Sequence, residues 1–444
     1  MYSRVADFFQ KRERAFFILQ GVILVLYVLL RVTTTVSALN APRELADTDI
    51  YARISTQPIL GPGFLEVDRP FVFPMLLQIV RQDYGTAAII QLALTILAWG
   101  LLAYFVSSSF QPVWLRLFSF LIVLALSLVR HLAGWDFVMM TESLSLSSFV
   151  FLIASAVWLL RGWRADKVVV LFVIAFIFAF TRDTNAYLLA MFAGLILFAV
   201  LFRWAMPNAL IVAAGFMLIF LISNLSADTS ERWMFPLVNV VGKRILPYAA
   251  SVKSFESCGM PVTPELLGLA DSFANGQDRA FFNDPALEGF RTWVRERGKS
   301  CYARWLLANP VQTVGAALGE FDGLIYFEDV GKYFSRRYAD ILPSQAERLL
   351  YPVYYITWLW ILLTIAALIA IVRRAWRNNI LWAVFILLAL TIFPHLFITW
   401  HGDAMAPHRH AVSVGLQLAL TTWLLILLII EQFDSQLAWE KQRT

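Results

Sequence analysis

Long runs of apolar residues dominate the chain. About 20 helical residues cross a hydrocarbon core about 30 Å thick, and nine runs of this sequence have about that length. They cover residues 15–39, 86–106, 114–132, 137–160, 186–202, 208–225, 353–372, 379–397 and 411–430. Each predicts a transmembrane helix.

A tenth apolar run, residues 167–180, is too short to cross a bilayer alone. The polar segment 181–185 that follows it would then lie at membrane depth. Charged, irregular backbone is tolerated there only inside protein or beside a wet cavity, so we expect Arg182 to lie beside a cavity. Adjacent helical residues do not face each other, so Arg182 and Asp183 are not expected to pair with one another. Structural partners elsewhere are the alternative.

The composition agrees with a membrane protein. Of the 444 residues, 59% are hydrophobic and 15% are charged, whereas about 25% are charged in soluble domains. A mean hydropathy of +0.67 also excludes a disordered chain. The net charge of +5 does not indicate nucleic acid, because membrane proteins need basic residues to keep loops in the cytoplasm. We therefore predict an all-α polytopic membrane protein with about ten transmembrane helices, surrounded by membrane lipids and without a nucleic-acid partner.

The basic residues predict the orientation. They gather at one side in the N-terminus, in Arg161, Arg164 and Lys167, in Arg203, in Arg373, Arg374 and Arg377, and in Lys441 and Arg443. Both termini are then cytoplasmic. Short loops favour a bacterial inner membrane, with the endoplasmic reticulum as the alternative. The first external loop, residues 40–85, departs from the rule because it also carries arginines, which suggests that these have another role.

The hydropathy collapses between residues 226 and 352, before the last three predicted spans. This divides the chain into an N-terminal transmembrane region (1–225), an extracytoplasmic domain (226–352) and a C-terminal transmembrane region (353–444). Cys258 and Cys301 both lie in the predicted domain. In an oxidising compartment they can pair, closing a loop worth on the order of 4 kcal/mol. Two unpaired, buried thiols are the alternative.

Acidic residues stand at two predicted external positions. Asp47 and Asp49 follow the first span, and side chains two residues apart on a helix point about 200° apart, so one of them is expected to face a site. Capping of a short helix is the alternative for both. Glu142 opens an otherwise apolar helix, where it either caps that helix through the dipole or faces a polar cavity.

Four of the five histidines, with Asp403 and Arg409, cluster before the last span. They are His395, His401, His408 and His410. Imidazole and carboxylate ligands suit zinc or manganese, but the spacing matches no metal motif, so no metal ligand is assigned and a divalent metal stays open. The planar guanidinium of Arg409 is suited to hold a phosphate.

The order of these motifs resembles the GT-C superfamily of membrane glycosyltransferases, which includes protein O-mannosyltransferases and the lipid A aminoarabinose transferase. The shared features are the acidic first loop, the Arg-Pro-aromatic-x-Pro segment from Arg69 to Pro74, the pair Thr141-Glu142 and an arginine before the last span. The resemblance covers most of the membrane part but not residues 226–352. His410 after Arg409 departs from the Arg-Tyr ending that is usual in the family.

The resemblance implies transfer of a sugar, with inversion, from a polyprenyl-phosphate donor to a glycan, lipid or protein acceptor outside the membrane, with no metal required in many members. Asp47 or Asp49 matches the family's catalytic carboxylate, with Asp47 preferred. The predicted substrate-binding residues are Arg69, Glu142, Arg182, Asp183, His401, Asp403, His408, Arg409 and His410.

Other functions fit parts of the pattern. A transporter or flippase would line its path with buried charges such as Arg182 and Asp183, and a scaffold or receptor would use the external region. A lipid-linked glycan polymerase or ligase of another fold would also bind polyprenyl carriers. Neither the sugar nor the acceptor follows from the sequence, since both depend on the shape of a pocket.

Overall fold

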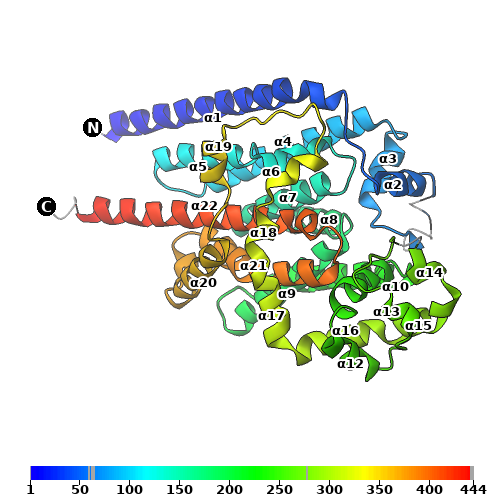
Figure 1. The fold of residues 1–444 in the computed structure, drawn as a ribbon. Coiled ribbons are helices and arrows are strands. Elements are labelled where there is room, and N and C mark those ends of the chain that lie inside the picture. The colour runs from blue at the N-terminus through cyan, green and yellow to red at the C-terminus, as the bar shows by residue number, and fades with distance from the viewer. Residues whose placement is uncertain (1, 59–60, 62–65, 277–278, 441–444) are drawn as a thin grey trace.

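The computed structural model describes residues 2–58, 61, 66–276 and 279–440. These residues form helices and connections without a strand, and an isolated bridge joins Arg43 to Val138. Figure 1 shows an elongated bundle with both chain ends at one end and with α2, α3 and α12 to α16 gathered at the other.

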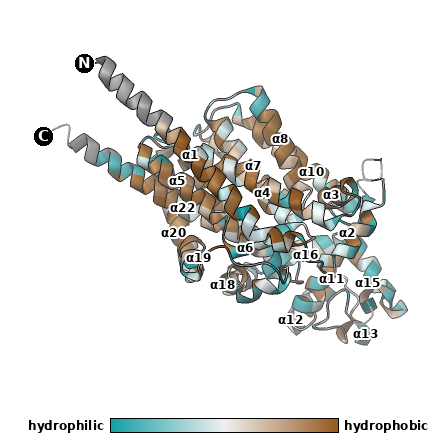
Figure 2. Ribbon diagram, turned by 90° about the horizontal axis from the view of Figure 1, so that it is seen from above, coloured by the Kyte–Doolittle hydropathy of each residue, from teal (hydrophilic) through white to brown (hydrophobic). Residues whose placement is uncertain are grey.

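The long helices of the bundle account for most of the chain. They are α1 (Tyr2–Leu39), α4 (Tyr84–Ser107), α5 (Val113–Leu126), α7 (Glu142–Leu160), α8 (Ala165–Ala179), α9 (Asp183–Leu201), α10 (Ala209–Thr229), α20 (Ile356–Val372), α21 (Leu381–Gly402) and α22 (Pro407–Glu440). Short helices form the opposite end, among them α2 (Thr48–Ser55), α3 (Val72–Ile79), α11 (Met234–Val240), α12 (Ala249–Glu256), α13 (Pro264–Leu267), α15 (Glu288–Trp293) and α16 (Lys299–Ala308). Figure 2 shows apolar residues concentrated on the bundle and polar residues on this end.

Within the described residues, seven helices are long and apolar enough to cross a membrane, and one bent pair raises the number to eight. The seven are the spans of α1, α4, α7, α9, α10, α21 and α22. This confirms an all-α, multi-pass membrane protein. The predicted number of about ten spans depends also on α8 and α20, which have 15 and 17 residues, and it stays a prediction, as does the side on which the termini lie. Lys441 and Arg443 are outside the described residues.

Two predicted spans differ from the observed helices. The run 114–132 is not continuous, because α5 and the segment Arg130–Phe137 meet at a bend of 58°. The run predicted from residue 137 becomes α7 only at Glu142. Residues before it bond to the first loop instead: Arg43 donates to the carbonyl of Phe137 at 2.7 Å, and Met139 donates to that of Arg43 at 2.9 Å.

Helix α7 is the central helix of the bundle. Seventy-eight per cent of its span is buried inside the protein, against 22% for α1. It contacts α4 and α8, and its buried serines let neighbouring backbones approach closely. Ser147 lies 2.8 Å from the hydroxyl of Thr95 on α4, and Ser145 accepts a 2.9 Å bond from Asn185 on α9.

A buried ion pair ties α1 to the turn before α7. Arg31 donates to the carboxylate of Asp136, and the two side chains are 0% and 2% exposed. Thr95 and Ser143 also donate to this carboxylate, at 2.7 and 2.6 Å.

The region predicted as one external domain divides between two cores. Residues from Met234 to Trp305 surround a hydrophobic core of their own, and we call this part the subdomain. Phe321, Val330 and Tyr351, farther along the chain, pack instead on the core of the bundle. In the subdomain, Cys258 and Cys301 are joined by a disulfide with their Cα atoms 6.1 Å apart, which is the first of the two alternatives that the sequence left open.

Reduction of the Cys258–Cys301 disulfide is expected to destabilise the subdomain. The bridge spans 43 residues, so in the loop-closure model it stabilises the folded protein by up to about 4 kcal/mol. Thermal unfolding in detergent with and without reductant measures the difference, and non-reducing peptide mapping tests the bond itself. Recovery of both cysteines as free thiols from unreduced protein would contradict the assignment.

Candidate functional site

Asp47 and Asp49 point in different directions at the start of α2. Asp47 is the N-cap residue of α2, but its side chain makes no capping hydrogen bond. It accepts instead from Arg409, with 2.9 Å between Nη2 and Oδ2. Asp49 is exposed, and no ion pair of its side chain is found in the described part of the chain. The geometry therefore separates the two carboxylates, as expected for positions two residues apart on a helix.

Glu142 lies close to two arginines. Its side chain is 1% exposed, with Oε1 lying 3.1 Å from Nε of Arg409 and 3.5 Å from Nη1 of Arg182. As the first residue of α7, it also benefits from the positive end of that helix. Both carboxylate oxygens nevertheless accept no hydrogen bond from the described residues. A buried carboxylate thus bridges two arginines at a distance and keeps capacity for further hydrogen bonds.

Arg182 occupies the break between α8 and α9. Its backbone is extended, with φ −155° and ψ 139°, and it is the N-cap residue of α9, three residues after α8 ends at Ala179. The guanidinium pairs with Glu142 and contacts Nδ1 of His410 on α22. Asp47, Glu142, Arg182, Arg409 and His410 therefore converge from four separate segments, and we call them the charged cluster.

Arg69 and Tyr51 border the charged cluster. Arg69 lies over the ring of Phe235 at 5.8 Å and makes no ion pair within the described residues. Burial is the main cause that raises the pKa of Tyr51 above its ordinary value. Arg69 opposes that rise, and the carboxylates of Asp47 and Glu142 add to it. Tyr51 is a neutral hydroxyl near the cluster that sequence reasoning had not included among the site residues.

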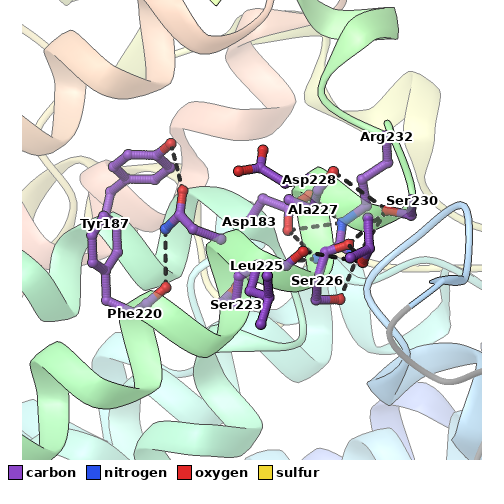
Figure 3. A network of polar contacts seen from close by, with 12 residues as sticks. Asp183, Tyr187, Phe220, Ser223, Leu225, Ser226, Ala227, Asp228, Ser230 and Arg232 are labelled. Carbon is purple, nitrogen blue, oxygen red and sulfur yellow. Dashed lines mark hydrogen bonds and ion pairs between the residues drawn. The ribbon is translucent and has the colours of Figure 1, made fainter. Parts of the chain in front are cut away.

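Asp183 belongs to a separate network. Arg232 forms a bidentate ion pair with it, in which Nε donates to Oδ2 at 3.0 Å and Nη2 donates to Oδ1 at 2.8 Å. Arg232 also donates to Ser226 at 2.8 Å and to Ser230 at 3.3 Å. Figure 3 shows this group, in which Asp183 at the start of α9 meets residues at and just after the end of α10. Asp183 is therefore paired with a structural partner, which was the alternative to a role beside a cavity. The structure does not bring it into the charged cluster.

His401, at the end of α21, and Asp403, just after it, contact residues of the subdomain. Asp403 accepts from Asn239 of the subdomain and from the backbone N–H of Met405, both at 2.9 Å. Burial raises the pKa of Asp403, and these hydrogen bonds oppose the rise. His401 lies 3.2 Å from the hydroxyl of Tyr302 and 3.0 Å from the carbonyl of Thr313. Both residues are therefore held by structural contacts outside the charged cluster, although they flank the turn that leads to Arg409.

The four clustered histidines do not share one site. His395 bonds to Gln417 at 2.8 Å, and the ring of His408 stacks on Phe327 with 4.3 Å between centroids. His410 contacts Arg182. Among the described residues, no group of three or more His, Cys, Asp or Glu side chains has the arrangement needed for a metal ion. The predicted histidine cluster is close in sequence but dispersed in space.

The charges of the cluster favour an anionic ligand. Asp47 and Glu142 balance Arg182 and Arg409, and nearby Arg69 adds one positive charge. Glu142, Arg182 and Arg409 have side chains that are 1%, 11% and 14% exposed, so water screens their charges little. Asp47 is more open, at 27%. This leaves a carboxylate accessible beside guanidinium groups that are fixed in a low-dielectric environment.

Comparison of this chain with family models, curated proteins and solved structures finds no match. Its function therefore has to be inferred from its own residues.

Proposed function

We propose that this protein is a membrane glycosyltransferase of the GT-C type, which moves a sugar from a polyprenyl-phosphate donor to an acceptor hydroxyl at the extracytoplasmic face. The observation that carries the proposal is the pair between Asp47, in the first loop, and Arg409, at the start of the last long helix, 362 residues apart. The resemblance to the GT-C superfamily implies that a first-loop carboxylate faces an arginine before the last span, and Glu142 and Arg182 lie in the same group of charges.

Asp47 acts as the general base in this proposal. The acceptor oxygen bonds to the anomeric carbon while the bond from that carbon to the phosphate oxygen breaks, so the configuration inverts. The acceptor proton passes to the carboxylate of Asp47, and the electron pair of the broken bond stays on the phosphate. A positioned base of this kind contributes about 10²- to 10⁴-fold to the rate.

The arginines stabilise the leaving phosphate. A guanidinium has five N–H donors, and Arg409 uses one in its hydrogen bond to Asp47. The Nε of Arg409 faces Oε1 of Glu142 at 3.1 Å, so the donors proposed for the phosphate are the remaining N–H groups of the guanidinium. Donors that are fixed before the reaction stabilise developing charge at little reorganisation cost. Arg409 and Arg182 are the proposed phosphate ligands, with Arg69 at the border.

Turnover by purified protein in lipid nanodiscs tests the proposal. A panel of polyprenyl-phosphate sugars is supplied with glycan, lipid and protein acceptors, without added metal and then with magnesium or manganese. We expect one donor to be consumed, with an inverted anomeric product and release of the polyprenyl phosphate. Because nanodiscs have no closed interior, transport cannot produce this signal.

A transporter or flippase gives the opposite result. It would leave every donor intact in nanodiscs and would move a labelled lipid-linked sugar between the leaflets of sealed vesicles. That pair of results would overturn the proposed activity and favour the alternative that the buried charges also suggest.

Replacement of Asp183 separates its network from the charged cluster. Asp183→Asn is expected to lower the free energy of unfolding by about 1 kcal/mol, because the largely buried Arg232 loses its charged partner while Asp183 itself is partly exposed. The turnover rate is expected to stay close to that of the unaltered protein. Thermal unfolding and the donor assay measure both effects, and a selective loss of turnover would return Asp183 to the site.

A further inference from the structure

A charge-free elbow joins the subdomain to the bundle. Helix α16 ends at Ala308, Asn309 interrupts the helix, and α17 (Pro310–Gly319) follows. No Asp, Glu, Lys or Arg occurs between Arg304 and Glu320. Sequence analysis had placed this stretch in the extracytoplasmic domain, outside the membrane.

The elbow exposes large apolar side chains beside a membrane span. Leu307 and Val311 are 81% and 88% exposed, whereas Thr313 and Ala317 on the other face of α17 are buried. Helix α17 contacts α21, which has the length and composition of a membrane span, and Figure 1 shows it beside that helix. The exposed face therefore belongs to a helix that packs directly against a candidate membrane span.

The irregular backbone at the elbow is satisfied by its own residues. The backbone N–H of Asn309 donates to the carbonyl of Trp305 at 3.1 Å, and its side-chain amide donates to the same carbonyl at 2.9 Å. The hydroxyl of Thr313 donates to the carbonyl of Asn309 at 3.0 Å. A non-helical turn that meets lipid requires such internal partners, because hydrocarbon offers none.

An apolar hollow opens beside the elbow. Its volume is about 150 Å³, and the lining residues are Tyr302, Leu306, Phe397, Ile398, His401 and Gly402. The imidazole of His401 is occupied by Tyr302 and the carbonyl of Thr313, so the accessible surface of the hollow is chiefly hydrocarbon. Lipid chains can fill such a hollow without losing hydrogen bonds, whereas a water molecule there would lose some of its own.

We propose that the α16–α17 elbow inserts into the leaflet on the subdomain side of the membrane, with Leu307 and Val311 among the hydrocarbon chains of bilayer phospholipids. This anchors the subdomain to the bilayer independently of its covalent connections. Burying the apolar faces of both side chains in the interface gives the insertion its free energy. The inference does not depend on the proposed enzymatic activity.

Site-directed fluorescence tests the insertion in the full-length protein. The two cysteines are joined to each other, so a single new cysteine supplies the thiol for an environment-sensitive dye. Leu307→Cys and Val311→Cys are compared with Leu267→Cys, an exposed leucine on α13 in the subdomain, in phosphatidylcholine nanodiscs. The unaltered protein measures background labelling.

Dyes at 307 and 311 are expected to emit at shorter wavelength and to lose fluorescence when spin-labelled lipid is incorporated, with little quenching by aqueous iodide. The dye at 267 is expected to show the reverse. Iodide quenching at 307 and 311 equal to that at 267, without quenching by the spin-labelled lipid, would overturn the insertion. Two independent positions keep the test decisive if one labelled variant fails to fold.

Discussion

Asp47→Asn is expected to reduce sugar transfer by about 10²- to 10⁴-fold, the contribution of a positioned general base. Asparagine keeps the size of the side chain but cannot accept the proton of the acceptor hydroxyl. Arg409 retains its contact with Glu142 at 3.1 Å, so the protein is expected to fold. The assay is the nanodisc turnover of whichever donor is identified, together with thermal unfolding of the same preparation.

Asp49→Asn is the matched control for this variant. Asp49 lies two residues away in the same loop and is exposed, so its replacement is expected to leave turnover unchanged. The reverse pattern, with activity lost only in Asp49→Asn, would move the base to the other carboxylate. Equal and full activity in both variants would remove the first loop from the chemistry.

Arg31→Met is expected to lower the free energy of unfolding by about 3–5 kcal/mol. The change leaves the carboxylate of Asp136, which is 2% exposed, without its cationic partner, and an unpaired buried charge is costly. Thermal unfolding in detergent measures the loss.

The double variant Arg31→Met with Asp136→Asn is the control for this prediction. Asparagine removes the negative charge but can still accept from Thr95 and Ser143, which donate to Asp136 at 2.7 and 2.6 Å. Most of the lost stability is therefore expected to return. If the double variant is as unstable as Arg31→Met alone, the two side chains are not coupled and the ion pair does not explain the effect.

The helical fold was predictable because hydrophobic runs of membrane-spanning length have few other structures available to them. The first span, residues 15–39, is an example in which the predicted bounds match the observed candidate span. The bend before α7 was not predictable in this way. Val113–Leu126 and Arg130–Phe137 are together apolar enough for one span, and the residues that follow bond to the backbone of Arg43 from another part of the chain.

Part of the candidate site could also be anticipated from the sequence. A carboxylate at the start of an apolar helix and an arginine in a short helical break must find partners, so Glu142 and Arg182 stood out. The identity of those partners could not be read from spacing, because Arg409 and Asp47 come from opposite ends of the sequence. His401 and His408 are close in sequence to Arg409, which suggested a shared site. Their partners are instead Thr313 and Phe327.

The Asp47–Arg409 pair has a consequence for biosynthesis. Asp47 emerges early from the ribosome, and its partner follows 362 residues later, which takes roughly 20–70 s at about 5–20 residues per second. Throughout that interval Asp47 lacks its guanidinium partner, whereas Glu142 gains Arg182 only 40 residues after its own synthesis and Arg409 much later. Chains released before α22 therefore leave Asp47 without the cation that neutralises it in the complete protein.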